Sequence, residues 1–422
     1  MDELDKKNSE VRLDKLDLIK ILLVFPTILF VMAFFFDSPY VIATGLYNII
    51  ISPDVLLTDY LSTGGIGAAF LNAALLTYAH IFIVYKLKVK INGPIIAALF
   101  TITGFSFFGK NIFNIWPIYL GGILYVKYRK IEYKNILIVM MFSTALAPIV
   151  TELSFNLQLP FYIRLLIGII VGMTCGFIVT PLAANMNKLH DGYNLYNVGF
   201  TAGLIGTVIN SLLKSFNINI VQQQTLSVEY DLVLKIVLFI LFIFLLCLGF
   251  LLNNRSFKGY TRILKYSGRL FTDFTQLENY SLTFINMGIM GLQSMLFVIV
   301  LRGTFNGPVF GSILTVAGFS AFGKHPKNTI PIMTGVLLAG ILKIWDVQTT
   351  AFIIAGLFGT TLAPIAGKYG FFPGILAGFL HLSVVMNVGV IHGGINLYNN
   401  GFAGGIVASV LFPVFEALKR GD

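Results

Sequence analysis

Two nearly identical polar stretches interrupt a chain that is otherwise mostly apolar. Residues 104–114 read GFSFFGKNIFN, and residues 318–328 read GFSAFGKHPKN. A lysine and the free N–H groups of a helix end together attract an anion or polarise a carbonyl group. We therefore predict a solute-binding site at the polar side chains that both stretches share, namely Ser106, Lys110, Asn114, Ser320, Lys324 and Asn328.

A structural role is the alternative for these side chains. The two lysines could extend to opposite membrane interfaces and mark the ends of two hairpins. The asparagines could cap short helices instead of binding a solute. Lysines in bulk solvent at opposite faces, with no polar cavity between them, would favour this alternative.

A second pair of polar stretches follows later in each half of the chain. Residues 190–200 read HDGYNLYNVGF, and residues 392–402 read HGGINLYNNGF. Both precede an apolar, glycine-rich segment, so their side chains could line a pore. The residues that we predict to contact a solute here are His190, Asn194, Asn197, His392, Asn396 and Asn399.

Capping and packing are the alternative for this second pair. Asn194 and Asn396 are good candidates for helix N-caps. Glycines four residues apart, as at Gly199 and Gly203, let a neighbouring helix approach closely. No carboxylate recurs beside the two histidines, so a metal site is not expected. The sequence also predicts no other cofactor.

The composition is that of a membrane protein. Of the 422 residues, 56% are apolar and only 11% are charged, and the mean hydropathy is +0.84. These values predict an all-α polytopic membrane protein. The excess of 29 Lys and Arg over 19 Asp and Glu is typical of cytoplasmic loops, so no nucleic-acid partner is expected.

The chain is a duplication. A shift of 214 residues aligns NGP at 92–94 with NGP at 306–308 and aligns the two glycine–lysine stretches. TALAPI at 144–149 aligns with TTLAPI at 360–365, and the two histidine stretches follow in the same order. The predicted division is a cytoplasmic arm at 1–20, a first membrane repeat at 21–220 and a second at 221–422.

Each half has seven apolar segments. In the first half they are 21–36, 61–84, 93–108, 112–126, 135–150, 160–183 and 194–215; in the second they are 235–252, 281–301, 305–322, 328–342, 349–367, 371–391 and 396–416. An odd number of segments predicts that the two repeats have inverted topology. With both termini in the cytoplasm, only six of the 29 basic residues lie outside, which satisfies the positive-inside rule for a cell-membrane protein.

The segments on either side of each glycine–lysine stretch are short for complete spans. We predict that each pair forms a re-entrant hairpin or two half-helices that meet at the glycines. Pro117 and Pro331 suit the first turn of the following helix. Non-helical backbone at this depth requires burial in protein or a water-filled cavity. Both stretches and both asparagine-rich elements should therefore surround a cavity between the halves.

Acidic residues are scarce inside the predicted spans. Asp59 and Asp273 stand at the start of spans, and Glu152 and Asp191 are expected in loops. Proton and sodium transporters usually carry an intramembrane carboxylate. Its absence favours a passive conduit, or coupling through backbone carbonyls or histidine, and argues against a cationic substrate.

The paired glycine motifs, the LAPI segments and the NLYN-x-GF elements resemble a bacterial family of uncharacterised multi-pass membrane proteins with duplicated halves. The resemblance covers nearly the whole chain and implies no function. DGYN at 191–194 is also similar to an element of urea transporters, which are inverted repeats as well. GGIN at 393–396 lacks the tyrosine of that element.

The function predicted from the sequence is a membrane transporter or channel for a small polar or anionic solute, with its path between the repeats. The alternatives are a urea-like passive channel for a neutral solute, a membrane scaffold, or an intramembrane enzyme that uses His190 or His392. No nucleophile elbow or phosphate loop is present, so we do not expect an enzyme. The expected partners are the solute and membrane lipid, and the sequence leaves open a homo-oligomer.

Overall fold

The computed structural model of the protein describes residues 13–419, except residues 56, 221–223, 271 and 343. The predicted cytoplasmic arm therefore lies outside the described residues as far as residue 12. The described part of the chain is helical, and its only β-type pairings are two isolated bridges. Ten of its helical stretches are long and apolar enough to cross a membrane. The protein is thus a multi-pass helical membrane protein, as predicted.

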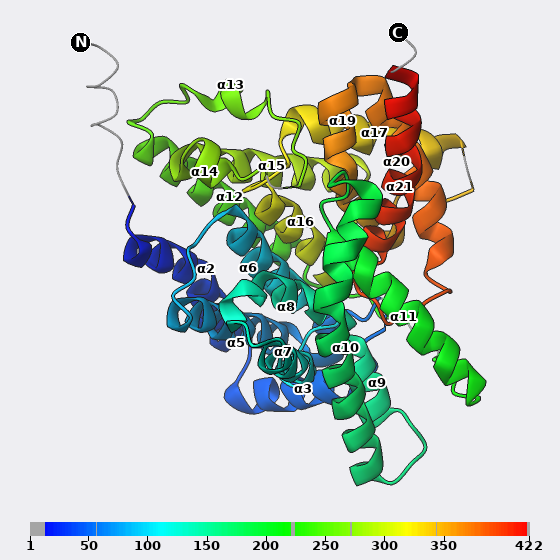
Figure 1. Cartoon of the computed structure of the whole chain (residues 1–422). Helices are drawn as coiled ribbons and strands as arrows, with labels where there is room; N and C mark the ends of the chain where they lie inside the picture. Colours follow the sequence, from blue (N-terminus) through cyan, green and yellow to red (C-terminus); the bar gives the residue numbers. More distant parts are fainter. Residues whose placement is uncertain (1–12, 56, 221–223, 271, 343, 420–422) are drawn as a thin grey trace.

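In the described part of the chain, ten α-helices form the first repeat, which occupies the blue to green part of Figure 1. Their bounds are α2 (Lys15–Phe36), α3 (Pro39–Ile51), α4 (Tyr60–Gly64), α5 (Ile66–Lys86), α6 (Gly93–Phe105), α7 (Trp116–Arg129), α8 (Leu137–Ser143), α9 (Ala147–Phe155), α10 (Phe161–His190) and α11 (Asn197–Ser215).

The second repeat has the same order of long and short helices. Their bounds are α12 (Asp231–Leu252), α13 (Tyr260–Ile263), α14 (Phe274–Leu277), α15 (Tyr280–Val300), α16 (Gly307–Phe319), α17 (Pro326–Leu342), α18 (Thr350–Gly359), α19 (Ala363–Tyr369), α20 (Phe371–Val388) and α21 (Asn399–Lys419). Each apolar segment predicted from the sequence corresponds to one of these helices, or to a helix pair at the LAPI segments.

The helix before each glycine–lysine stretch is too short to span a bilayer. Both α6 and α16 have 13 residues, a rise of about 20 Å, whereas the hydrocarbon core is about 30 Å thick. The chain turns after these helices at Gly109 and Gly323, whose φ angles are +84° and +85°. This left-handed conformation favours glycine. The prediction of a break at the glycines is confirmed.

The two prolines near the breaks differ in position. Pro117 lies in the first turn of α7, as predicted. The prediction is wrong for Pro331, which lies inside α17 because that helix already begins at Pro326. The second break is shorter than the first, because HPKN at 325–328 contains a proline that can begin the helix, whereas NIFN at 111–114 contains none.

The repeats meet at two helix crossings. Helices α6 and α16 cross at Gly104 and Gly311, where a Cβ added to Gly104 would lie 2.5 Å from the Gly311 carbonyl oxygen. Helices α11 and α21 cross at Gly199 and Gly401, where a Cβ added to Gly199 would lie 3.1 Å from the Gly401 Cα. Figure 1 shows α10 and α11 of the first repeat beside α21 of the second. Glycine permits these close approaches, as expected from the glycine spacing.

Reciprocal caps also join the repeats. The Asp59 carboxylate accepts a hydrogen bond from the Gly307 N–H at the start of α16, at 3.2 Å. The Asp273 carboxylate accepts one from the Gly93 N–H at the start of α6, at 3.1 Å. Each repeat therefore caps the short helix of the other. This reciprocal arrangement is what a pseudo-two-fold axis between inverted repeats requires.

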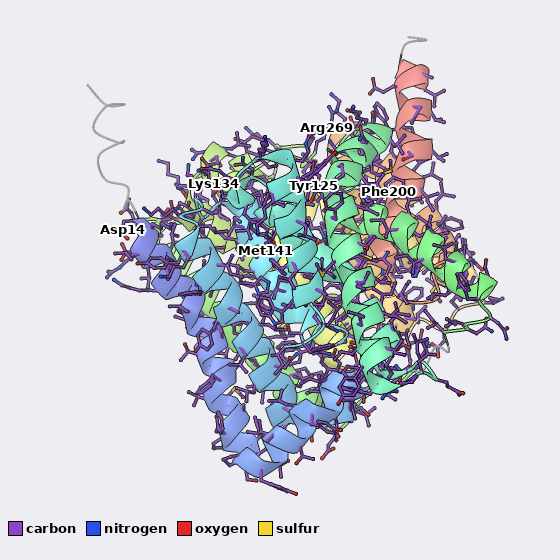
Figure 2. The ribbon with its side chains drawn as sticks, turned by 60° about the horizontal axis from the view of Figure 1, so that its bottom comes forward. Asp14, Tyr125, Lys134, Met141, Phe200 and Arg269 are labelled. Carbon is purple, nitrogen blue, oxygen red and sulfur yellow. The ribbon has the colours of Figure 1, made fainter. Side chains whose placement is uncertain are left out.

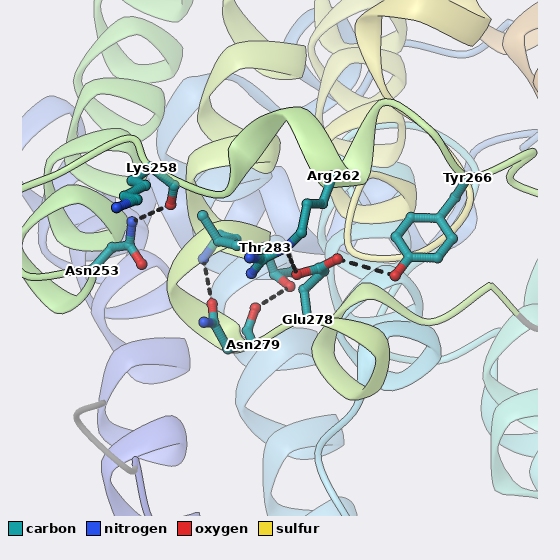
Figure 3. Close-up of polar contacts among 8 residues, drawn as sticks. Asn253, Lys258, Arg262, Tyr266, Glu278, Asn279 and Thr283 are labelled. Atoms are coloured by element: carbon teal, nitrogen blue, oxygen red, sulfur yellow. Dashed lines mark hydrogen bonds and ion pairs between the residues drawn. The ribbon is translucent and has the colours of Figure 1, made fainter. Parts of the chain in front are cut away.

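Polar contacts hold the connection between α12 and α15, in the second repeat. Figure 3 shows Arg262 and Tyr266 both reaching Glu278, at 2.7 and 3.0 Å. The Asn279 side chain accepts from the Leu282 N–H, which caps α15.

Figure 2 shows Lys134 and Arg269 at the same end of the helix bundle, with Met141 of α8 further along it.

Candidate functional site

Each lysine of the glycine–lysine stretches reaches a tyrosine of the other repeat. Lys110 donates a 2.6 Å hydrogen bond from Nζ to the hydroxyl of Tyr398. Lys324 donates a 2.6 Å hydrogen bond to the hydroxyl of Tyr196 and a second one, of 2.9 Å, to Thr360. The two lysine–tyrosine pairs are related by the pseudo-two-fold symmetry.

Both lysines are deeply buried. Neither side chain has solvent exposure, so the alternative that they extend to opposite interfaces does not hold. Each Nζ also lies over aromatic rings, for example 4.4 Å from the ring centroid of Tyr196 for Lys324. No carboxylate among the described residues forms an ion pair with either lysine. A buried ammonium group without a counter-ion is costly, and an anion nearby would recover part of that cost.

Asparagine side chains complete the hydrogen bonding of each break. The Asn72 amide donates to the carbonyls of Ser106 and Lys110, at 2.7 and 2.9 Å. The Asn286 amide donates to the carbonyls of Ser320 and Lys324, at 2.7 and 2.8 Å. These carbonyls lack helical partners at the break and would otherwise be unsatisfied. Neither asparagine is among the residues predicted from the sequence, although FLN at 70–72 aligns with FIN at 284–286.

Four of the predicted site residues bond to their own break. The hydroxyls of Ser106 and Ser320 donate to carbonyls one turn earlier in α6 and α16, each at 2.7 Å. The amides of Asn114 and Asn328 donate to the carbonyls of Gly109 and Gly323, at 3.0 and 2.8 Å. In the structure these side chains fix the backbone that carries the lysines.

The histidine stretches form two matching loops. His190 is hydrogen-bonded to Asn197 at 3.0 Å, and His392 to Asn399 at 2.9 Å. The side-chain amide of Asn197 also donates to the Ala183 carbonyl of the preceding helix, and that of Asn399 donates to the Val385 carbonyl. The histidines and these asparagines thus tie each loop to the helix before it.

Asn194 and Asn396 do not cap helices, so the capping alternative does not hold for these two residues. Helices α11 and α21 begin three residues later, at Asn197 and Asn399. The Asn194 amide instead donates to the Gly401 carbonyl of the other repeat, at 3.1 Å, and Asn396 donates to the Gly199 carbonyl, at 3.3 Å. The side-chain oxygen of Asn194 accepts from the N–H of Tyr196, and that of Asn396 accepts from the N–H of Tyr398. These contacts place both tyrosines beside the axis between the repeats.

A cavity of about 480 Å³ lies between the repeats at this point. Three pairs of aromatic residues related by the pseudo-symmetry line it: Phe105 with Phe319, Phe142 with Phe358, and Tyr196 with Tyr398. Thr101 and Thr315 form a fourth pair. The cavity therefore lies on the axis that relates the repeats, and its lining is mainly apolar.

The cavity continues along one side only. Beyond the paired residues, its lining includes Val139 of α8 and Thr180, Ala183 and Asn187 of α10 in the first repeat. Leu270 and Phe322 of the second repeat also contribute to the lining. The side chains of Thr180 and Asn187 each have a buried oxygen without a hydrogen-bond partner. In the second repeat, the equivalent positions of α18 and α20 pack together in one apolar cluster, through Ala355, Leu382 and Val385.

The predicted site residues thus have different places around the cavity. Within the described part of the chain, Asn197 is the one that belongs to the lining. Lys110 and Lys324 lie directly behind the lining tyrosines. The other nine hold the breaks and loops in place. Tyr196 and Tyr398 are not among the predicted residues, although both belong to the repeated NLYN element.

Glu152 is not in a loop, contrary to the prediction. It lies in α9, within the apolar stretch Leu137–Phe155, and is 8% exposed. Glu152 lies inside the helix because α9 extends beyond LAPI, at 146–149, as far as Phe155. Asp54, in the connection between α3 and α4, is fully buried and was missed. The scarcity of buried carboxylates that the sequence indicated therefore does not hold for the first repeat.

Comparison with known proteins gives a family for this chain. No curated protein and no solved structure matches it. The sequence model of one family matches twice, over residues 38–215 and 252–417, so that it covers most of both repeats. The duplicated halves and the family resemblance predicted from the sequence are confirmed. The chain belongs to the family described as "Protein of unknown function (DUF1576)".

Proposed function

We propose that the protein is a membrane transporter for a small organic anion, which binds in the cavity between Tyr196 and Tyr398. The observation that carries this proposal is the pair of buried lysine–tyrosine hydrogen bonds beside a cavity on the pseudo-two-fold axis. Transporters built from inverted repeats commonly bind their substrate at such an interface, near broken helices. The volume of about 480 Å³ is within the range of small-molecule sites.

The hydrogen bonding of the tyrosines favours a negatively charged group. Each tyrosine oxygen accepts from a lysine Nζ, so its own O–H is free to donate into the cavity. A phenol that accepts from an ammonium group is a strengthened donor, because hydrogen bonds in a chain polarise one another. Two such donors suit a carboxylate, whose two oxygens accept several hydrogen bonds.

The rest of the lining favours an apolar body on the same solute. Five phenylalanines line the cavity together with the tyrosines, and most of its surface is apolar. A strongly hydrated zwitterion or sugar would leave hydrogen bonds unmade against these rings. The proposed substrate therefore has one anionic group and an apolar or aromatic remainder.

The one-sided cavity supports a carrier rather than an open channel. The first repeat is open between α8 and α10, whereas the second is closed between α18 and α20. In a carrier of this architecture, exchange of the two repeat conformations would open the other side. The open side is near Lys134 and Lys188, so the positive-inside rule assigns it to the cytoplasm, together with both termini.

A matched pair of ligands tests the proposal. Benzoate and benzamide have nearly the same shape, but only benzoate is charged at neutral pH. We expect benzoate to raise the melting temperature of the purified protein and to be taken up by proteoliposomes, and benzamide to do neither. Uptake of benzamide or urea at equal rates would favour the passive channel for neutral solutes. No flux of any small carboxylate or amide would favour a scaffold or an intramembrane enzyme.

A further inference from the structure

The first repeat contains a buried polar cluster that the proposed substrate path does not use. Its centre is Asp54, which has no solvent exposure. One carboxylate oxygen accepts from the Tyr60 hydroxyl at 2.6 Å. The other accepts from Thr151 at 2.6 Å, Asn114 at 2.9 Å and Asn111 at 3.0 Å. All four donors are neutral.

A second carboxyl group lies against this cluster. Glu152 follows Thr151 in α9, and its carboxylate lies near enough to Asp54 that, in addition to burial, charge repulsion between them raises the pKa of the Asp54 carboxyl. Glu152 is 92% buried, and its Oε1 atom has no hydrogen-bond partner. Two carboxylates this close in a buried site cannot both be ionised without strong repulsion. A single proton on the pair of carboxyl groups removes that repulsion. It also accounts for the unpartnered Oε1 atom of Glu152, which can carry the proton.

No basic side chain among the described residues neutralises the pair. None of the ion pairs in that part of the chain includes Asp54 or Glu152. Lys110, in the neighbouring break, extends away to Tyr398. Arg164, on the adjacent helix α10, donates to the carbonyl of Phe155. Among the described residues, Tyr60 is the titratable side chain that is hydrogen-bonded to Asp54.

The second repeat shows that the fold does not need this cluster. The residues equivalent to Asp54, Thr151 and Glu152 are Gly268, Gly367 and Lys368. A Cβ at Gly268 would lie 1.9 Å from the Gly323 carbonyl oxygen, so backbone fills the space there. A Cβ at Gly367 would lie 2.0 Å from the Ser267 carbonyl oxygen. One break is therefore built without any carboxyl group, and the other contains two.

We propose that Asp54 and Glu152 form a binding site for one exchangeable proton. On the basis of the proposed function, this proton is the coupling ion that drives uptake of the anion. Burial supports the assignment, because it raises the pKa of the Asp54 carboxyl to about 7. The site also has a direct connection to the substrate cavity. The Asn114 amide donates to both the Asp54 carboxylate and the Gly109 carbonyl. Lys110, which follows Gly109 in the chain, donates to the Tyr398 hydroxyl at the cavity.

Infrared spectroscopy of the purified, reconstituted protein tests the site without a substrate. Between pH 5 and pH 9 we expect the C=O stretch of one protonated carboxyl group to disappear, with a midpoint near neutral pH. Asp54→Asn and Glu152→Gln each remove one of two repelling groups, so each should lower the midpoint by about one pH unit or more. The double variant should lose the band. Asp17→Asn, at an exposed position of α2, is the matched control and should leave it unchanged.

Several results would overturn this proton site. Identical titrations of the wild type and both single variants would show that Asp54 stays ionised and only supports the break. If the double variant does not fold, the single variants still decide. A midpoint that falls in NaCl but not in choline chloride would assign the site to an alkali cation instead.

A transport arm separates this inference from the proposed function. An inward pH gradient should accelerate benzoate uptake in proteoliposomes that contain the wild type. In the two single variants this acceleration should be reduced at least about tenfold, because the remaining carboxyl group binds the coupling proton too weakly near neutral pH. An intact titration together with no benzoate uptake by the wild type would leave the proton site in place and reject the proposed substrate. Equal acceleration by the gradient in the wild type and both variants would reject the coupling role.

Discussion

The Nζ atom of Lys324 lies 2.6 Å from the hydroxyl of Tyr196, and the two residues belong to opposite repeats. The same relationship joins Lys110 and Tyr398 at the same distance. Each lysine stands directly after a positive-φ glycine, so the break itself aims its side chain across the repeat interface. A broken helix in one repeat thus determines the hydrogen bonding of a cavity residue in the other.

Removal of one lysine charge should weaken anion binding. Lys324→Gln keeps much of the length of the side chain and its hydrogen-bonding capacity. We expect it to reduce benzoate affinity by ~1.5–3 kcal/mol, roughly ten- to a hundred-fold, because a charged hydrogen bond becomes a neutral one. Calorimetric titration measures this loss. Lys327→Gln, at an exposed position of α17, is the control and should have little effect. An unchanged affinity in Lys324→Gln, Lys110→Gln and the double variant would remove the lysines from the mechanism.

The two tyrosines should differ in their effect on stability. Tyr398→Phe removes the hydrogen-bond partner of Lys110, which has no second one in the described residues. Tyr196→Phe leaves Lys324 bonded to Thr360. An unpaired buried donor costs about 1–3 kcal/mol. The thermal unfolding temperature in detergent should therefore fall more for Tyr398→Phe than for Tyr196→Phe. The reverse order would contradict this account of the lysine contacts.

Asn72 should be essential for the first break. Asn72→Leu keeps the approximate volume but leaves the carbonyls of Ser106 and Lys110 unsatisfied, at about 1–3 kcal/mol each. We expect a large loss of thermal stability, together with weaker ligand binding. Asn185→Leu, at an exposed position of α10, is a matched control that should be nearly neutral. If the two variants were equally stable, the break would have to hold its shape by other means.

The topology can be tested with single cysteines in a Cys247→Ser background, since Cys247 is the exposed native cysteine. A membrane-impermeant thiol reagent should label Asn217→Cys and Arg302→Cys from outside the cell. Lys88→Cys and Ser256→Cys should react only after the membrane is permeabilised, because the positive-inside rule places their loops in the cytoplasm. Labelling of Ser256→Cys in intact cells would be incompatible with inverted repeats.

The sequence by itself determined the architecture. Helix spans follow from long apolar runs, and the duplication follows from ordered matches such as the two NGP triplets. The break at each glycine–lysine stretch was also predictable, because local backbone chemistry decides it: only glycine readily adopts the positive φ found at Gly109 and Gly323. The position of Pro331 and the extent of the helix around Glu152 required the actual helix ends, which a hydropathy pattern locates only approximately.

Only the tertiary structure decided which polar residues face the cavity. Asn194 looked like a helix cap from its position, but it bonds a carbonyl of the other repeat. Lys110 and Tyr398 are 288 residues apart, and no local pattern could pair them. Asp54 and Glu152 likewise meet only because α9 packs against the connection after α3. Contacts between distant segments depend on how the two repeats pack, and it is this packing that determines which side chains are satisfied internally and which remain available to a ligand.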